Sequence, residues 1–172
     1  HLNSRLSTAT LLHFENRQMD HDGNGDGFMD MPKLRQYNLM HRWAYVSPRW
    51  ISQLLLRGLH DERQGGQSAK HATISSAPLY ATAVETDRYE MQWKNGFTLN
   101  ADHITSIALM LHGSWHDADY GFGYTRYDVT KKNGYDQLMF ETDTDDHTNI
   151  SGGESLHQDG YDDRVTPLRP LP

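Results

Sequence analysis

The chain has 172 residues, and its 23 Asp and Glu against 16 Lys and Arg give a formal net charge of −7. This acidic balance disfavours nucleic acid and anionic membrane surfaces as partners and suits the binding of cations. The chain contains no cysteine, which excludes disulfides, thiolate metal sites and cysteine nucleophiles. It also has no apolar run of the length that a membrane-spanning helix needs, so we expect no membrane span.

Apolar residues near the start of the chain predict a first helix. Ser7 or Thr8 is a suitable N-cap, because its hydroxyl can accept a hydrogen bond from a free N–H group of the first turn. The apolar face that follows recurs at roughly helical spacing, through Leu11, Leu12, Phe14 and Met19.

Residues 20–34, Asp-His-Asp-Gly-Asn-Gly-Asp-Gly-Phe-Met-Asp-Met-Pro-Lys-Leu, carry oxygen-bearing side chains at alternate positions with glycines between them. A calcium ion prefers about six to eight oxygen ligands, and a short loop supplies them only if alternate residues turn inward. The predicted ligands are Asp22, Asn24, Asp26, the backbone carbonyl of Phe28, and Asp30. An alternative register uses Asp20, Asp22 and Asn24, with Gly25 at the turn.

With Asp22 at its first position, this loop resembles the calcium-binding loop of the EF-hand family. The resemblance implies that Gly27 makes the sharp turn and that Met29 pairs the loop with a neighbouring loop. It also implies a bidentate Glu at the twelfth position, where this chain has Lys33. Either the site is weakened or the missing oxygens come from elsewhere. A second helix is expected after the loop, with Pro32, Leu34, Tyr37, Met40 and Ala44.

The next segment carries helix signals without ligands. Ser47 and Pro48 combine a cap with a first-turn proline, which predicts a buried helix. The apolar face of this helix would be formed by Ile51, Leu54, Leu55 and Leu59. A carboxylate-poor stretch over residues 61–71 and a short strand around Ile74 resemble an EF-hand loop that has lost its ligands.

A further helix is expected from Ser76 or Pro78 through Val84. Residues 86–100 contain an Asn95-Gly96 turn signal and receive no assignment.

Residues 117–128 form a third candidate loop. Asp117, Asp119 and Asp128 fit ligand positions, but Phe122 stands where the glycine belongs. An aromatic-rich hairpin is the alternative. An entering helix is indicated by the spacing of Ile104, Ile107, Ala108 and Leu111.

Residues 143–154 match the same twelve-position loop near the end of the chain. The candidate ligands there are Asp143, Asp145, Asn149, Ser151 and Glu154. Two positions depart from the pattern, because His147 offers a nitrogen ligand and Thr148 replaces the glycine of the turn. A short entering helix is expected over residues 135–140, and an empty, degenerate loop is the alternative.

Together these segments predict a mainly α fold of EF-hand-like helix-loop-helix units that can pair, with short β segments between the loops. The resemblance is to the sarcoplasmic calcium-binding type. Residues 1–172 would form a single domain or two tight lobes, about 1–85 and 86–160, with a Pro-rich tail over 165–172.

The expected function is calcium binding, as a buffer or a structural calcium protein, without enzymatic activity. For nucleophilic catalysis the sequence offers no Gly-x-Ser-x-Gly elbow. The seven Met are dispersed rather than clustered as in a sensor groove. An alternative is an extracellular matrix or assembly protein in which calcium only rigidifies the fold, and whose Trp- and Tyr-rich surface meets a protein partner or a second copy. The first residue is His1 rather than Met, which is compatible with secretion.

A rival hypothesis is a copper or zinc protein based on histidine. His112 and His116 stand four residues apart, which would place both imidazoles on one face of a helix, with Asp117 or Asp119 as a third ligand. A mature N-terminal His1 resembles the copper ligand of lytic polysaccharide monooxygenases.

Overall fold

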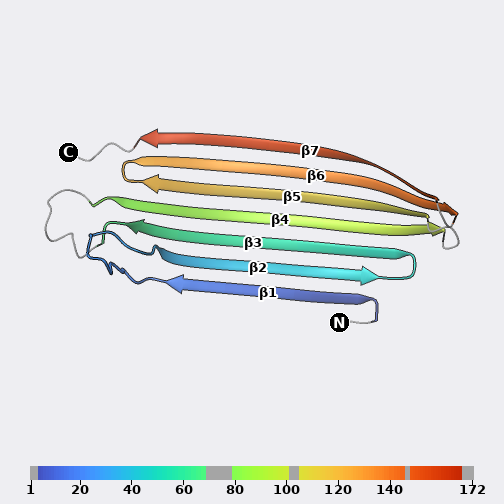
Figure 1. The fold of residues 1–172 in the computed structure, drawn as a ribbon, viewed down its shortest axis with the longest axis horizontal. Coiled ribbons are helices and arrows are strands. Elements are labelled where there is room, and N and C mark those ends of the chain that lie inside the picture. Colours follow the sequence, from blue (N-terminus) through green and yellow to red (C-terminus); the bar gives the residue numbers. More distant parts are fainter. Residues whose placement is uncertain (1–3, 69–78, 101–104, 146–147, 168–172) are drawn as a thin grey trace.

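The computed structural model describes residues 4–68, 79–100, 105–145 and 148–167, which form one seven-stranded antiparallel sheet (Figure 1). The strands lie in the sheet in the same order as in the chain, so each strand pairs with the next one along the sequence. They are β1 (Leu6–Arg17), β2 (Lys33–Val46), β3 (Trp50–Gly66), β4 (Ala81–Asn100), β5 (Thr105–Phe122), β6 (Thr125–Asp145) and β7 (Thr148–Pro167).

The expected mainly helical, EF-hand-like fold is wrong, because none of the described residues is helical. The helix expected before the calcium loop is strand β1, and the helix expected after it is β2. The apolar face that begins at Ile51 belongs to β3. The segments expected as helices around Ala108 and over residues 135–140 lie in β5 and β6.

Several expectations fall outside the described residues. These are the strand around Ile74, the helix start at Ser76 or Pro78, and the roles of His1 and His147. The end of that helix, expected through Val84, is instead the beginning of strand β4. The sheet is continuous across the boundary expected between two lobes at residue 85, because β4 pairs with both β3 and β5 over its length. The expected tail begins inside β7, which extends to Pro167.

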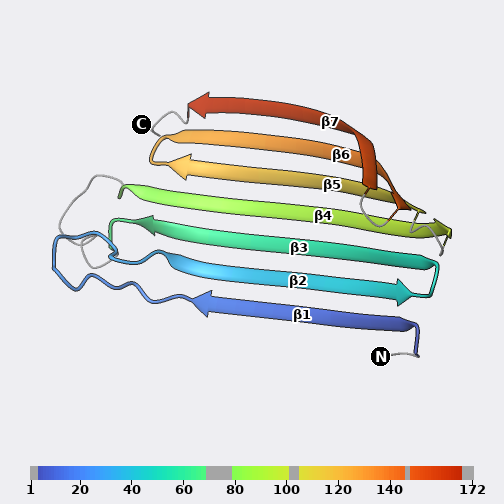
Figure 2. The ribbon, with the colours of Figure 1, turned by 45° about the vertical axis from the view of Figure 1, so that its right-hand side comes forward.

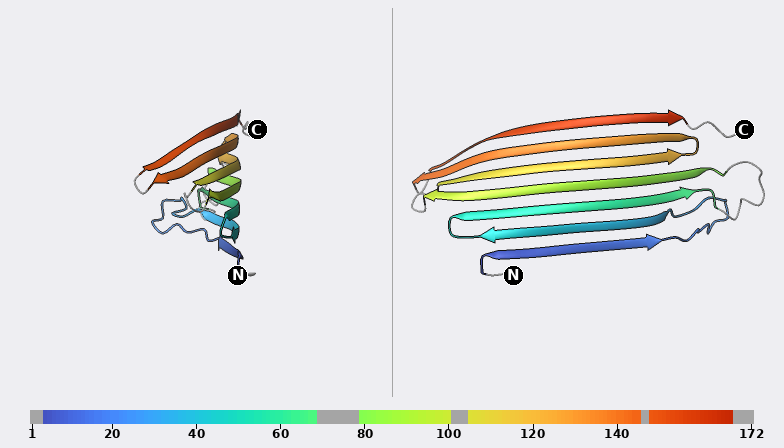
Figure 3. Two further views of the ribbon diagram at one scale, coloured as in Figure 1. Left: turned by 90° about the vertical axis from the view of Figure 1, so that its right-hand side faces the viewer. Right: turned by 180° about the vertical axis from the view of Figure 1, so that it is seen from behind.

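The sheet is a single layer. Seen edge-on, the strands follow one another in one curved sheet, and the ends of β6 and β7 bend to one side (Figures 2 and 3). Among the described residues, Leu34 and Ala118 are the only buried hydrophobic side chains. Three tryptophans, Trp43, Trp50 and Trp93, remain 37%, 38% and 39% exposed.

The register fixes which side chains share each face of the sheet. Side chains alternate between the faces along each strand, and directly paired residues of neighbouring strands share a face. One face, here called the aromatic face, carries ring pairs such as Phe14 with Tyr37, Trp50 with Phe97, and Tyr89 with Trp115. The same face carries the ion pair of Arg35 with Glu62 at 3.4 Å, and the opposite face carries that of Arg57 with Glu90 at 3.1 Å.

The two ends of the sheet also differ. At one end, β2 and β3 are joined by a short turn around Ser47, and at the other end the longer segment 18–32 connects β1 to β2 (Figure 1). This longer segment packs on the end of β3, where Phe28 forms a bridge with Gln67. The Met29 N–H group donates to the Gly66 carbonyl at 2.9 Å, and the Ser68 N–H group donates to the Gly27 carbonyl at 2.8 Å.

None of the described residues belongs to a helix that is long and apolar enough to cross a membrane.

Candidate metal sites

The acidic segment 20–30 lies in the connection between two antiparallel strands, not between two helices. The sequence-predicted ligands Asp22, Asn24, Asp26 and Asp30 therefore do share one loop, but its flanks are β1 and β2. Lys33 is the first residue of β2 and pairs with Gln64, so the helical twelfth position implied by the EF-hand resemblance does not exist here.

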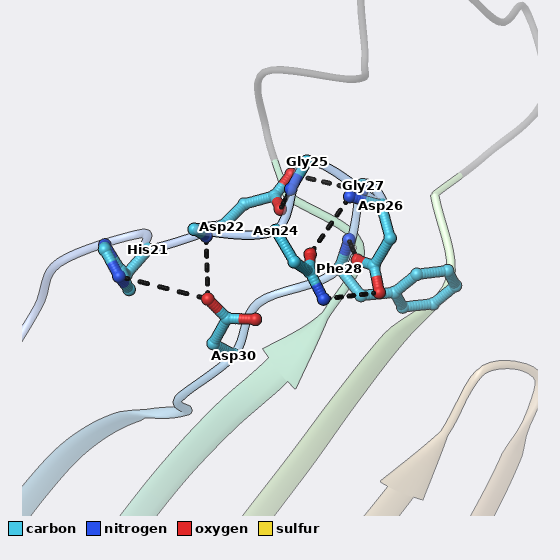
Figure 4. A network of polar contacts seen from close by, with 9 residues as sticks. His21, Asp22, Asn24, Gly25, Asp26, Gly27, Phe28 and Asp30 are labelled. Carbon is cyan, nitrogen blue, oxygen red and sulfur yellow. Dashed lines mark hydrogen bonds and ion pairs between the residues drawn. The ribbon is translucent and has the colours of Figure 1, made fainter.

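Side-chain oxygens of this loop accept hydrogen bonds from its own backbone (Figure 4). Asp22 accepts from the Gly25 N–H group at 2.8 Å and, through its other oxygen, from the Gly27 N–H group at 3.1 Å. Asp30 accepts from the Gly23 N–H group at 2.7 Å. Such local bonds wrap the backbone around the acidic side chains.

The remaining ligand candidates continue the same pattern. Asn24 accepts from the Asp26 N–H group at 3.1 Å, and Asp26 accepts from the Phe28 N–H group at 2.9 Å. The second oxygen of Asp26 accepts a hydrogen bond from the side-chain amide of Asn24 at 3.0 Å. Gly25 and Gly27 have φ angles of 73° and 87°, a region that side chains with a Cβ disfavour. The alternation of Asx residues with glycine thus has a direct structural role.

The loop carboxylates are not drawn together in this structure. Among the described residues, only one group of three imidazole or carboxylate side chains has ligand atoms within 4.8 Å of one another, and it lies elsewhere on the sheet. An ion in the loop would therefore have to draw Asp22, Asp26 and Asp30 closer together. Carbonyl and amide oxygens of the loop would complete its coordination.

The second candidate loop, residues 143–154, is divided between two paired strands. Asp143 and Asp145 belong to β6, and Asn149, Ser151 and Glu154 belong to β7. Asp143 pairs with Asn149, whereas Glu154 pairs with Leu138. Five residues of extended strand span about 16 Å, so the structure does not bring Glu154 to the turn.

The third candidate segment, residues 117–128, is a tight hairpin, which confirms the alternative interpretation. Phe122 pairs with Thr125, and Gly123 in the turn has a φ of 57°. Asp119 and Asp128 face each other across the hairpin, and both bind the guanidinium of Arg126. These hydrogen bonds, chiefly that with Asp119, raise the pKa of Arg126 above its ordinary value.

The histidine pair expected on a helix lies on strand β5. Four residues of extended strand separate His112 from His116 by about 13 Å, which is too far for one ion to bind both. The zinc or copper site predicted at this pair is therefore not formed.

A different cluster was missed by sequence reasoning. His60, Glu85 and Asp87 place ligand atoms within 4.8 Å of one another on β3 and β4. The His60 ring contacts Asp87 through Nδ1 at 2.9 Å and Glu62 through Nε2 at 3.1 Å. The hydrogen bond with Asp87, followed by that with Glu62, raises the pKa of His60 above its ordinary value of 6.5.

The sequence signal for this cluster is a two-residue spacing within each strand. His60 and Glu62 fall on one face of β3, and Glu85 and Asp87 fall on the same face of β4. This spacing indicates a cluster only when both segments are known to be paired strands.

Comparisons of the chain with protein-family models, with characterised proteins and with solved structures find no match.

Proposed function

We propose that the protein binds calcium through the loop between β1 and β2, with Asp22, Asn24, Asp26, Asp30 and the Phe28 carbonyl as ligands. The observation that carries the proposal is the set of side-chain to backbone hydrogen bonds in residues 22–30, which already folds the loop around its own acidic groups. All the proposed ligands are oxygens, which suits a hard cation.

We propose that the bound calcium has a structural role, because the loop between β1 and β2 also contacts the end of β3. Gly27 and Met29 exchange backbone hydrogen bonds with Ser68 and Gly66 at the end of β3. An ion that orders residues 22–30 would thus also fix the connection between β1, β2 and β3. It would act by reducing the freedom of the loop, without any catalytic step.

Calorimetric titration of the metal-free chain with Ca²⁺ tests the proposal. Asp26→Asn keeps an oxygen that can accept the Phe28 N–H bond but removes one negative charge, so we expect calcium affinity to fall at least tenfold. Asp136→Asn is the matched control, because Asp136 is an exposed aspartate in the middle of β6. Equal affinity for wild type and Asp26→Asn, or an equal loss in the control, would contradict the proposal.

A second candidate function, assembly with further copies of the chain, is favoured by the aromatic face. Large apolar patches that stay exposed mark interaction surfaces in soluble proteins. Tyr89 and Phe97 are 55% and 44% exposed on this face, beside the partly exposed Trp93. Sedimentation with and without calcium tests this candidate: assembly predicts a mass that rises with concentration, and a constant monomer mass would exclude it.

A further inference from the structure

We infer that His60, Glu85 and Asp87 form a binding site for one divalent transition-metal ion of the zinc class, separate from the proposed calcium loop. The site would use one imidazole nitrogen and two carboxylate oxygens, a ligand set that suits Zn²⁺ better than Ca²⁺. The three side chains come from adjacent strands in the interior of the sheet, not from a terminus or a loop.

The backbone register fixes the geometry of this site. His60 of β3 is paired directly with Asp87 of β4, and Glu62 is paired directly with Glu85. Since all four side chains project to one face, they form the corners of a square across the two strands. Ligand atoms of three corners already lie within 4.8 Å of one another. Rotamer changes alone could bring them to one ion, without movement of the backbone.

Charge also favours a cation at this place. Glu62 and Glu85 face each other directly, and like charges in directly opposed positions of a sheet are destabilising. Arg35 approaches Glu62 at 3.4 Å from β2, with its own side chain 46% exposed. Among the described residues, none forms a hydrogen bond or an ion pair with the side-chain carboxylate of Glu85. A metal ion would provide the positive charge that Glu85 lacks.

Glu62 would act as a positioning residue for the histidine. Its carboxylate lies 3.1 Å from Nε2 of His60, while Nδ1 faces Asp87 at 2.9 Å. If the proton stays on Nε2 and is donated to Glu62, Nδ1 is left free to bind the metal in place of its present contact. A carboxylate behind a metal-binding histidine fixes the tautomer and the ring orientation in this way.

Zinc titration of the metal-free, full-length chain in excess Ca²⁺ tests this inference, because calcium would keep the loop between β1 and β2 filled. We expect one Zn²⁺ per chain in the wild type. His60→Gln and Glu85→Gln should each lower zinc affinity at least tenfold, and Glu62→Gln should lower it about 10- to 100-fold with the stoichiometry kept. The ¹⁵N shifts of His60 should place the metal on Nδ1 and the proton on Nε2.

His116→Gln is the matched control, because His116 lies in β5 and projects to the opposite face of the same sheet. It should bind zinc as the wild type does. Should His60→Gln fail to fold, Glu85→Gln decides the question, because Glu85 is exposed. The inference is overturned if the wild type takes up no zinc, if Glu85→Gln binds it with unchanged affinity, or if His116→Gln loses it. Metal found on Nε2 would overturn the role of Glu62.

Discussion

Asp22 illustrates how one side chain can serve both folding and ion binding. Its two oxygens accept hydrogen bonds from Gly25 and Gly27, whose positive φ angles aim their N–H groups back into the loop. A carboxylate offers about four lone-pair sites, so each oxygen keeps capacity for an ion. The loop can therefore hold its shape without metal and still provide ligands.

At the same scale, Asp159 on β7 provides a test of the local electrostatics. Its pKa is lowered from the ordinary 3.8, mainly by a hydrogen bond from Asn133 and then by one from His157. A lowered pKa means that the stabilising contribution is present above the unfolded-state pKa and is lost as the pH falls through the folded-state pKa.

We predict that Asn133→Ala raises the pKa of Asp159 toward its ordinary value, because the largest cause of the shift is removed. Carbon-detected NMR titration of the carboxyl group between about pH 2 and pH 6 measures this directly. His157→Ala should produce a smaller rise, since its contribution ranks second. Identical titration curves for wild type and Asn133→Ala would show that Asn133 does not form the hydrogen bond with Asp159 that lowers its pKa.

At the scale of elements, the error in fold class has an identifiable cause. In β3, Ile51, Leu54, Leu55 and Leu59 recur at helical spacing only because apolar residues occupy both faces of the strand. A strand with a single apolar face would alternate cleanly, but this strand does not, so its periodicity is ambiguous.

The strand signal was present in the segment that received no assignment. Alternate positions of β4 are apolar from residue 89 to residue 99, with the exception of Asn95: Tyr89, Met91, Trp93, Phe97 and Leu99. The Asn95-Gly96 pair is typical of a turn, yet both residues lie inside β4, where they pair with Ser52 and Ile51 of β3. Long-range pairing thus overrode a local turn preference. The acidic loop could be predicted from sequence because its ligands are local, whereas the His60 cluster depends on the strand register.

Gly66, at the end of β3, provides a test of the close contact between this strand end and Tyr80, the residue before β4. A Cβ there would lie 2.3 Å from the Tyr80 carbonyl oxygen, and its φ of 111° disfavours any other residue. We predict that Gly66→Ala lowers the free energy of unfolding by about 3 kcal/mol or more, from backbone strain and overpacking together. Urea unfolding measures the loss.

Gly96→Ala is the matched control for this substitution, because a Cβ at Gly96 meets nothing within 4 Å and the residue lies inside a paired strand. It should change the free energy of unfolding by no more than about 1 kcal/mol. Equal effects of the two substitutions would contradict the close approach of Gly66 to Tyr80.

At the scale of the whole molecule, the single layer has little core to stabilise it. Among the described residues, just two hydrophobic side chains are buried. Because a sheet normally buries one face against a second layer, the ordering of a loop makes a large relative contribution to the stability of this single layer. An ion that binds only the folded state adds about 2.7 kcal/mol at a hundredfold excess over its Kd. For a sheet of this kind, calcium would be a substantial part of the stability.

We therefore predict that chelation of calcium lowers the melting temperature of the wild-type chain. Differential scanning calorimetry with and without excess chelator measures the shift. Asp26→Asn should show a smaller shift than the wild type at the same calcium concentration, because its affinity for the ion is at least tenfold lower. A chelator effect of equal size in both proteins would place the calcium outside the loop.

Amide chemical shifts recorded during a Ca²⁺ titration test most directly whether calcium binds the loop between β1 and β2. We predict saturable shifts over residues 22–30, largest at Gly25 and Gly27, whose N–H groups bond to Asp22. Residues 148–154 of β7 should keep their shifts. Unchanged signals over residues 22–30, or saturable shifts confined to 148–154, would contradict calcium binding in this loop.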